Sequence, residues 1–71
     1  MTTKFQLREN SDYIQLIQLL KALDIAESGS VAQEMVVAGE VKVNGQIDYR
    51  KRAKIRKGDS VEIWDERIEV E

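Results

Sequence analysis

The chain of 71 residues contains no cysteine and no histidine. These absences exclude a disulfide framework, a metal site built from thiolate or imidazole ligands, and catalysis by a Cys-His or Ser-His-Asp arrangement. No apolar run approaches the roughly 20 residues of a membrane-spanning helix, and the N-terminus lacks the charged and apolar regions of a secretory signal. We therefore expect a cytoplasmic protein that needs no cofactor and no metal.

The chain is also too short to form a large hydrophobic core. Apolar residues make up 42% of it and charged residues 34%, which indicates a folded chain and not a disordered acidic tail. There is no internal repeat and no linker-like segment, so residues 1–71 are expected to form a single domain. A domain this small buries only roughly 60% of its unfolded surface, which argues against a deep substrate pocket.

The N-terminal part carries a strand pattern and then a helix pattern. Polar and apolar residues alternate over Lys4–Arg8, which predicts a short half-buried strand. Asn10 and Ser11 are suitable helix caps, and apolar residues then recur at steps of three and four. This spacing predicts a helix over Asp12–Leu23, whose apolar stripe comprises Ile14, Leu16, Ile17, Leu20 and Leu23.

A second helix pattern spans Gly29–Ala38. Ser28 is a suitable N-cap, and Gly39 is expected to end the helix. The first turn, Ser28-Gly29-Ser30, combines small side chains with backbone N–H groups at the positive end of a helix dipole, where an anion can bind. The alternative is that Ser28 caps the helix and no ligand binds, and Glu27 would compete with a phosphate on its own side of the turn.

The C-terminal part reads as strands joined by tight turns. Asn44-Gly45 is the strongest short-range signal for a two-residue hairpin, and turns are also expected at Gly58-Asp59 and Asp65-Glu66. The apolar residues that alternate around these turns are Val41, Val43, Val61, Ile63, Ile68 and Val70. The predicted fold is α+β, with two N-terminal helices packed on a small antiparallel sheet and a short N-terminal strand.

The basic segment, residues 42–57, holds most of the positive charge. It contains seven basic residues and one acidic residue, a net charge of +6, whereas the rest of the chain has a net charge of −8. If the odd-numbered residues Ile47, Tyr49, Ala53 and Ile55 point inward, the even-numbered cations point to solvent on one face with Lys42. These cations are Arg50, Arg52, Lys54 and Arg56.

Arginine donors match phosphate oxygens, so this face can follow a phosphate backbone. The alternative is a solvated loop without a ligand, or a strand whose charges pair with the acidic residues of Glu62–Glu71.

Three aromatic residues have different expected places. Phe5 is expected in the core. Tyr49 is also expected to pack in the core, although a tyrosine near the sheet can stack on an unpaired base. Trp64 interrupts the inward series of Val61 and Ile63, so it either points outward or closes the edge of the sheet.

The order of these pieces resembles the αL RNA-binding domain, the ribosomal-protein-S-four type. The resemblance spans about residues 12–63 and rests on three blocks of sequence. These are Ser28-Gly29-Ser30-Val31-Ala32, then Ala38-Gly39-Glu40-Val41-Lys42-Val43-Asn44-Gly45, and later Lys54-Ile55 with Gly58-Asp59. The chain is most similar to the small stand-alone bacterial members, the YbcJ type.

The resemblance implies non-enzymatic binding of a structured RNA, ribosomal RNA above all, and a link to translation. It also implies that the first turn of the second helix, Lys42 and the following basic residues line one RNA-binding face. In the wider family an arginine commonly follows the serine at the helix start, and Gly29 stands in its place here. The candidate RNA-binding residues are Ser28, Gly29, Ser30, Lys42, Asn44, Arg50, Lys51, Arg52, Lys54, Arg56 and Lys57.

Two other functions compete with RNA binding. A protein-interaction module would dock a protein partner on the edge of the C-terminal hairpin, on the first helix or on the basic segment. An enzyme is disfavoured, because paired carboxylates such as Asp65 and Glu66 lie in a predicted exposed turn without a companion base or a pocket.

Overall fold

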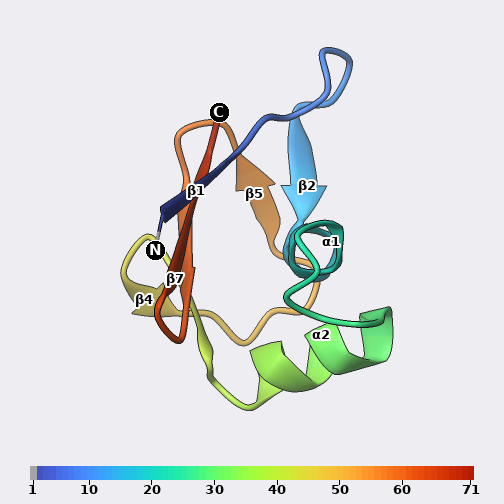
Figure 1. Cartoon of the computed structure of the whole chain (residues 1–71), viewed down its shortest axis with the longest axis vertical. Coiled ribbons are helices and arrows are strands. Elements are labelled where there is room, and N and C mark those ends of the chain that lie inside the picture. The colour runs from blue at the N-terminus through green and yellow to red at the C-terminus, as the bar shows by residue number, and fades with distance from the viewer. Residues whose placement is uncertain (1) are drawn as a thin grey trace.

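The computed structural model describes residues 2–71, which fold into two sheets and two helices (Figure 1). A five-stranded sheet has the strand order β1-β7-β6-β3-β4, and β2 pairs with β5 in a separate two-stranded sheet. The elements are β1 (Thr2–Phe5), β2 (Tyr13–Gln15), α1 (Leu16–Ala22), α2 (Gly29–Val37), β3 (Val41–Val43), β4 (Gln46–Ile47), β5 (Lys54–Arg56), β6 (Ser60–Ile63) and β7 (Glu66–Val70). The predicted α+β class is confirmed.

The core lies between the five-stranded sheet and the helices. In Figure 1 this sheet stands at the left, and both helices and the β2–β5 pair lie to its right. Each helix buries one apolar stripe, and the strands of the large sheet bury alternate residues. The stripe of α1 agrees with its prediction only in part, because Leu19 is buried and Ile17 and Leu23 are half-buried. The buried side chains include Leu16, Leu19 and Leu20 of α1, Ala32, Met35 and Val36 of α2, and Val41, Val61, Ile63, Ile68 and Val70 of the sheet.

The N-terminal strand lies two residues earlier than predicted. β1 covers Thr2–Phe5 instead of Lys4–Arg8 and pairs in parallel with β7, at the edge of an otherwise antiparallel sheet. The pairing of β1 with β7 ends at Phe5, which lies opposite Val70. The Leu7 N–H still donates to the Glu71 carbonyl at 3.0 Å, and Glu71 donates to Phe5 at 2.8 Å.

The helix predicted over Asp12–Leu23 is wrong in its first turn. Tyr13–Gln15 is a strand paired with β5, and α1 begins only at Leu16. Apolar residues at positions 14, 16 and 17 fit either conformation, and the open edge of β5 decides between them. The predicted caps Asn10 and Ser11 are not used: no side chain caps α1.

The second helix agrees closely with its prediction. α2 covers Gly29–Val37, and the Ser28 hydroxyl accepts a hydrogen bond from the Val31 N–H at 3.3 Å. The helix ends before Gly39, which has a φ of +77°. Such a left-handed backbone favours glycine, so the stop signal acts as the sequence indicated.

The predicted hairpin at Asn44-Gly45 is confirmed. Both turn residues have positive φ, +51° and +86°, as a two-residue type I′ turn requires. The Asn44 side chain also ties this turn to the next one: its Oδ1 accepts from the Ser60 N–H at 2.9 Å, and its Nδ2 donates to Asp59 at 3.1 Å. Asp59 in turn accepts from the Arg56 N–H at 2.8 Å, so two turns are held together.

The last hairpin turns one residue earlier than predicted. Its turn residues are Trp64 and Asp65, not Asp65 and Glu66, and Trp64 adopts a φ of +53°. The register pairs Ile63 with Glu66, so the strands meet immediately on either side of these two residues. Ile68 and Val70 are buried on the return strand, as predicted. No helix within residues 2–71 is long and apolar enough to cross a membrane.

Replacing Asn44 tests the link between the two turns. Asn44→Ala removes the side-chain hydrogen bonds and leaves a residue that disfavours positive φ. We expect the free energy of unfolding to fall by about 1–3 kcal/mol, measured by urea denaturation. Asn44→Gly loses the same bonds but accepts the backbone angle, so it should lose less. Unchanged stability in both variants would contradict a linking role for the side chain.

Replacing Gly39 tests the end of α2. A Cβ at this position would lie 3.2 Å from Cε1 and Oη of Tyr49, in addition to the positive φ. Gly39→Ala should therefore lower the free energy of unfolding by about 1–2 kcal/mol, seen as a lower Tm. Gly29→Ala is the matched control, because a Cβ there meets only Lys21 Cδ at 4.0 Å. An equal loss in both variants would refute this explanation.

Candidate nucleic-acid interface

The candidate RNA-binding residues lie on three parts of the fold. Ser28, Gly29 and Ser30 form the start of α2. Lys42 and Asn44 lie in the β3–β4 hairpin. The other six lie between β4 and β6, and they are Arg50, Lys51, Arg52, Lys54, Arg56 and Lys57. All the candidates except the half-buried Gly29 are solvent exposed, so each is accessible to a ligand.

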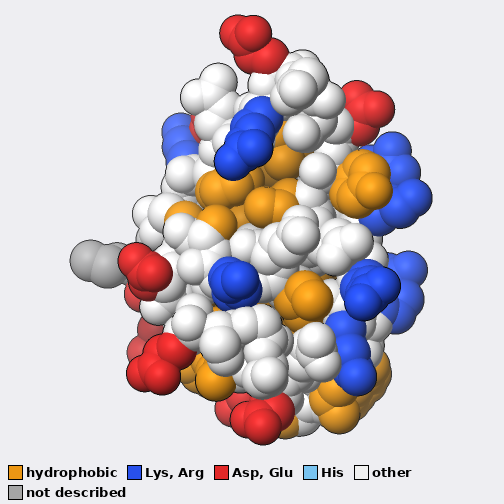
Figure 2. Space-filling view, turned by 90° about the vertical axis from the view of Figure 1, so that its right-hand side faces the viewer, with side chains coloured by type: hydrophobic (Ala, Val, Ile, Leu, Met, Phe, Trp, Pro, Cys, Tyr) orange, Lys and Arg blue, Asp and Glu red, His pale blue; other side chains and the backbone are white. Residues whose placement is uncertain are grey.

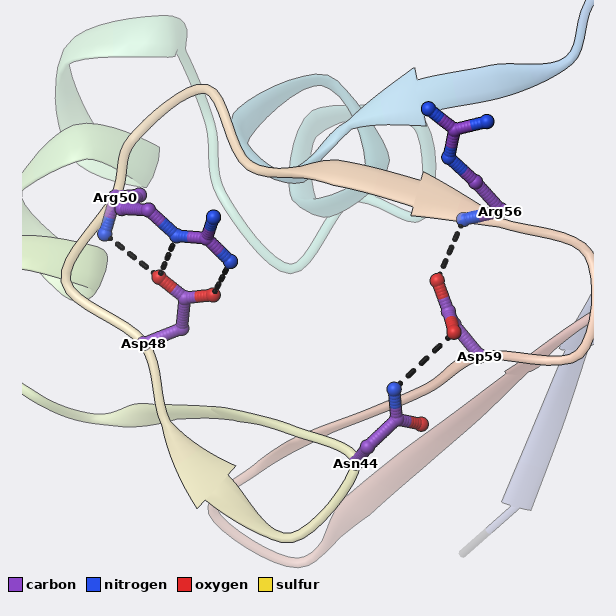
Figure 3. Close-up of polar contacts among 5 residues, drawn as sticks. All are labelled: Asn44, Asp48, Arg50, Arg56 and Asp59. Atoms are coloured by element: carbon purple, nitrogen blue, oxygen red, sulfur yellow. Dashed lines mark hydrogen bonds and ion pairs between the residues drawn. The ribbon is translucent and has the colours of Figure 1, made fainter.

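Arg50 differs from the other cations because its charge is already paired. Its Nε and one terminal nitrogen donate to the Asp48 carboxylate at 3.0 and 2.7 Å, and its backbone N–H donates at 2.9 Å (Figure 3). The Asp48 side chain is only 11% exposed, against 77% for Arg50. The side-chain hydrogen bond from Arg50 lowers the pKa of Asp48 despite partial burial, and the same contact raises the pKa of Arg50.

The lowered pKa of Asp48 determines the pH range in which the Asp48–Arg50 pair stabilises the fold. A carboxyl whose pKa is lower in the folded than in the unfolded chain stabilises the fold at pH values above its unfolded pKa. The contribution disappears as the pH falls through the folded pKa. The Asp48–Arg50 pair is therefore formed at neutral pH and is lost only under acid conditions.

The same pair shapes the loop before β5. The Asp48 N–H donates to the Val41 carbonyl at 3.1 Å, and the Ala53 N–H donates to the Arg50 carbonyl at 3.2 Å. Residues 48–53 consequently form turns and no strand. The expected alternation through the basic segment is therefore wrong at its start: Ile47 and Tyr49 are 47% and 62% exposed instead of buried.

The loop continues along the beginning of α1. The carbonyl of Ala53 accepts from the Leu16 N–H at 2.9 Å, and the carbonyl of Lys51 accepts from the Ile17 N–H at 3.4 Å. These contacts satisfy helix N–H groups in place of a side-chain cap. They also fix the backbone on both sides of Arg52, whose side chain extends into solvent.

Two lysines lie near α2. Lys51 and Ser30 line one concave surface along this helix, which also includes Glu34. Lys21, on α1, places its Cδ 4.0 Å from the position of a Cβ on Gly29. Sequence reasoning missed Lys21, since nothing in the linear spacing connects it with Gly29. The first turn of α2 contains no acidic residue, so no carboxylate of this turn neutralises the positive end of the helix dipole.

The alternation holds from Ala53 onward. Ala53 and Ile55 are buried, whereas Lys54 and Arg56 point to solvent from β5. The Lys54 Nζ lies 5.0 Å from the centre of the Tyr13 ring, a cation–π distance. Tyr13 faces Arg56 across the strand pair. Sequence reasoning missed Tyr13 because it assigned this residue to a helix; the strand-forming triplet Tyr13-Ile14-Gln15 was the available signal.

Lys42 and Asn44 are not brought into the same sheet as Lys54 and Arg56. Lys42 lies on the exposed side of β3, between Ile47 on one neighbouring strand and Glu62 on the other. A carboxylate directly opposite offsets part of its charge. The Asn44 side chain is engaged with Asp59 and Ser60, as Figure 3 shows for the Asp59 contact.

The aromatic residues fulfil only part of the expectations. Phe5 is half-buried and packs against the core, as predicted. The prediction that Tyr49 packs in the core is wrong, because its ring covers Gly39 at the surface. Trp64 points outward, is 62% exposed, and donates from Nε1 to Glu40 at 3.4 Å.

The charges are unevenly distributed over the surface. Figure 2 shows Lys and Arg side chains gathered along one edge of the molecule and several Asp and Glu side chains along the opposite edge. Ion pairs within residues 2–71 join Lys4 to Glu71, Arg67 to Glu69, and Arg50 to Asp48. The other cations of the basic segment take part in none of these pairs. Their charges are thus available to an anionic ligand.

Known proteins share this fold and sequence pattern. The putative RNA-binding protein YbcJ of Escherichia coli is 36% identical over 58 residues, which cover 82% of this chain and 83% of that protein. The uncharacterized protein YbcJ of Shigella flexneri has the same identity and coverage. The solution structure of YbcJ from E. coli, which reveals an αL motif involved in RNA binding, matches with a TM-score of 0.73 at 34% identity.

That structural match covers 96% of this chain and 85% of the E. coli chain. The S4 domain family matches residues 5–71, nearly the whole length. The predicted resemblance is confirmed, and the chain belongs to the S4 domain family.

Proposed function

We propose that the protein is a non-enzymatic RNA-binding module that holds a structured RNA by its phosphate backbone. The observation that carries this proposal is the set of exposed cations, in the loop before β5 and on β5, that form no ion pair with another described residue (2–71). The backbone that carries them is held by hydrogen bonds to α1 and β2. A set of cations held at fixed positions suits a polyanion with a defined shape.

The start of α2 adds a second kind of contact. Its first N–H groups and the positive end of its dipole attract a phosphate, Lys21 lies close to Gly29, and Lys51 lines the same concave surface as Ser30. These lysines supply positive charge at a position where the resemblance implies an arginine and this chain has Gly29. The site therefore combines helix N–H groups, two lysines and the cations of β5.

Paired A-form RNA favours this mode of binding. Its deep, narrow major groove is closed to side chains, so proteins recognise it largely by shape, phosphates and 2′-hydroxyls. The E. coli relative carries the name of a putative RNA-binding protein, and its αL motif is described as involved in RNA binding. We extend the proposal to ribosomal RNA and to a ribosome-linked role in the cytoplasm.

The candidate residues are proposed to act in two ways. Lys51, Arg52, Lys54, Arg56 and Lys57 contact phosphates directly, together with the α2 turn and Lys42. Arg50 and Asn44 act mainly by position, because their side chains are engaged with Asp48 and with Asp59 and Ser60.

Charge reversal tests the direct contacts. In Lys51→Glu/Lys54→Glu, two phosphate contacts are lost and two negative charges are introduced. We expect the affinity for a ribosomal RNA hairpin to fall by on the order of 100-fold at low salt. The slope of log K against log salt concentration should also become less negative. The change should equal the contribution of two phosphate contacts, each of which adds about −0.9 to the slope on a duplex. Fluorescence anisotropy at several salt concentrations measures both quantities.

The matched control is Lys4→Glu/Arg67→Glu, which makes the same change in net charge at residues outside the proposed site. Its affinity should change far less. Equal losses in the two double variants would reduce the proposal to a net-charge effect, and salt-independent binding by the wild type would contradict it. In a native pull-down, a protein partner that survives nuclease would instead support a protein-interaction module.

Releasing Arg50 from its ion pair with Asp48 should raise the affinity for RNA. Asp48→Asn removes the carboxylate charge but keeps a side-chain oxygen for the Arg50 N–H. Arg50 then becomes available to phosphate, so RNA affinity should rise several-fold and the salt slope should steepen by about one contact. The same titration measures it. Weaker binding with an unchanged circular dichroism spectrum would show that the pair orients the loop for RNA.

A further inference from the structure

Beside the predicted RNA-binding cations lies a hollow that none of them lines. It has a volume of about 590 Å³, within the range of roughly 300–1,000 Å³ that is usual for small-ligand sites. Figure 2, which views the β2 and α1 side of the molecule, shows hydrophobic side chains at the floor of a hollow in its upper half. The lining residues are Phe5, Gln6, Leu7, Arg8, Ser11, Tyr13, Ile14, Gln18 and Ala22.

The walls of this hollow are held by backbone hydrogen bonds. The segment after β1 is attached to the C-terminal residue, since Leu7 donates to Glu71 at 3.0 Å and Glu71 donates to Phe5 at 2.8 Å. A turn closed by Ser11 N–H and the Arg8 carbonyl at 3.0 Å follows. The opposite walls belong to α1 and to β2, which is paired with β5. The hollow is thus a built feature of the fold.

Tyr13 joins the hollow to the candidate RNA-binding cations. Its side chain lines the hollow, and the Lys54 ammonium lies 5.0 Å from the centre of its ring. Arg56 is its cross-strand neighbour. A ligand on the cations of β5 therefore has an aromatic ring and an apolar recess directly beside it.

The lining chemistry suits a nucleobase. Aromatic and aliphatic side chains can cover the face of a base, and base–aromatic stacking is tolerant of base identity. The amides of Gln6 and Gln18 and the hydroxyl of Ser11 can donate and accept hydrogen bonds at its edge. Arg8 is the charged residue in the lining, and its sign matches a phosphate next to the base.

We propose that this hollow accepts one unpaired, extruded base of the bound RNA, stacked against Tyr13, while the flanking phosphates lie on Lys54, Arg56 and Arg8. The inference rests on the proposed RNA-binding function and deepens it. It makes the preferred ligand a paired RNA with a single-nucleotide bulge, since phosphate contacts alone do not distinguish such an RNA from a continuous duplex.

The test compares two RNA hairpins that differ only in one bulged adenosine. The wild-type protein should bind the bulged hairpin about 5- to 100-fold more tightly, the range expected for stacking one base. Only the bulged hairpin should shift the methyl NMR signals of Leu7 and Ile14, which line the hollow. Equal affinities for the two hairpins would overturn the inference and leave RNA binding itself intact.

Two variants locate the effect. Tyr13→Leu removes the ring but keeps an apolar side chain, and Ala22→Phe fills the hollow from the exposed end of α1 without altering β2. Both should lose the preference for the bulge, and Ala22→Phe, which leaves Tyr13 and Lys54 in place, should retain the affinity for the continuous hairpin. Retention of the preference by both would overturn the inference. Lys51→Glu/Lys54→Glu is the contrasting control and should weaken binding of both hairpins.

A titration with free adenosine monophosphate distinguishes a site for a base within RNA from a site for a free nucleotide. The free nucleotide should bind far more weakly than the bulged hairpin, because the cations of β5 then hold no neighbouring phosphates. Binding as tight as that of the bulged hairpin would overturn the inference in favour of a site for free nucleotides. If the wild type bound neither hairpin, the proposed function would fail, and this inference with it.

Discussion

The pairing of β2 with β5, and its continuation into α1, is the interaction on which the candidate site depends. Three residue pairs form the strand ladder, and the carbonyls of Lys51 and Ala53 then accept from the first N–H groups of α1. One run of backbone hydrogen bonds thus ends a strand, begins a helix and fixes the path of the basic segment. Without it, the cations would sit on an unrestrained loop and would lose conformational entropy on binding.

The separation of charge suits a small protein that binds a polyanion selectively. The basic segment has a net charge of +6 while the whole chain has a net charge of −2. The local field attracts phosphate over about one Debye length, roughly 8–10 Å at physiological salt, whereas the acidic remainder disfavours non-specific coating by nucleic acid. Asp48 restricts the field further, because it neutralises Arg50 within the basic segment itself.

The elements that the sequence predicted well are those specified by local chemistry. The Ser28 cap, the stop at Gly39 and the hairpin at Asn44-Gly45 each need one or two residues in a particular backbone conformation, and those residues are present. The burial of Ala53 and Ile55 likewise follows from alternation within one strand. Such signals do not depend on distant parts of the chain.

The elements that the sequence predicted poorly depend on partners far away in the chain. Tyr13–Gln15 forms a strand only because β5, some 40 residues later, offers an edge. Tyr49 is exposed because Asp48 bends the loop and Gly39 leaves room for the ring. Lys21 meets the α2 turn only through helix packing. The outlines of the site were readable from composition, but its geometry was set by tertiary contacts.

The irregular loop has a consequence for the kind of RNA that fits. A regular strand through residues 47–56 would have placed its even-numbered cations in one straight row, suited to an extended single strand. Instead the turn at Asp48–Ala53 separates two groups, with Lys51 near α2 and Lys54 and Arg56 on β5. Cations that diverge from a rigid corner match phosphates on different segments of a folded RNA better than successive phosphates of one strand. Backbone hydrogen bonds from Asp48 to Val41 and from Ala53 to Arg50 hold this corner, so the path of the loop sets the spacing between the two groups of cations.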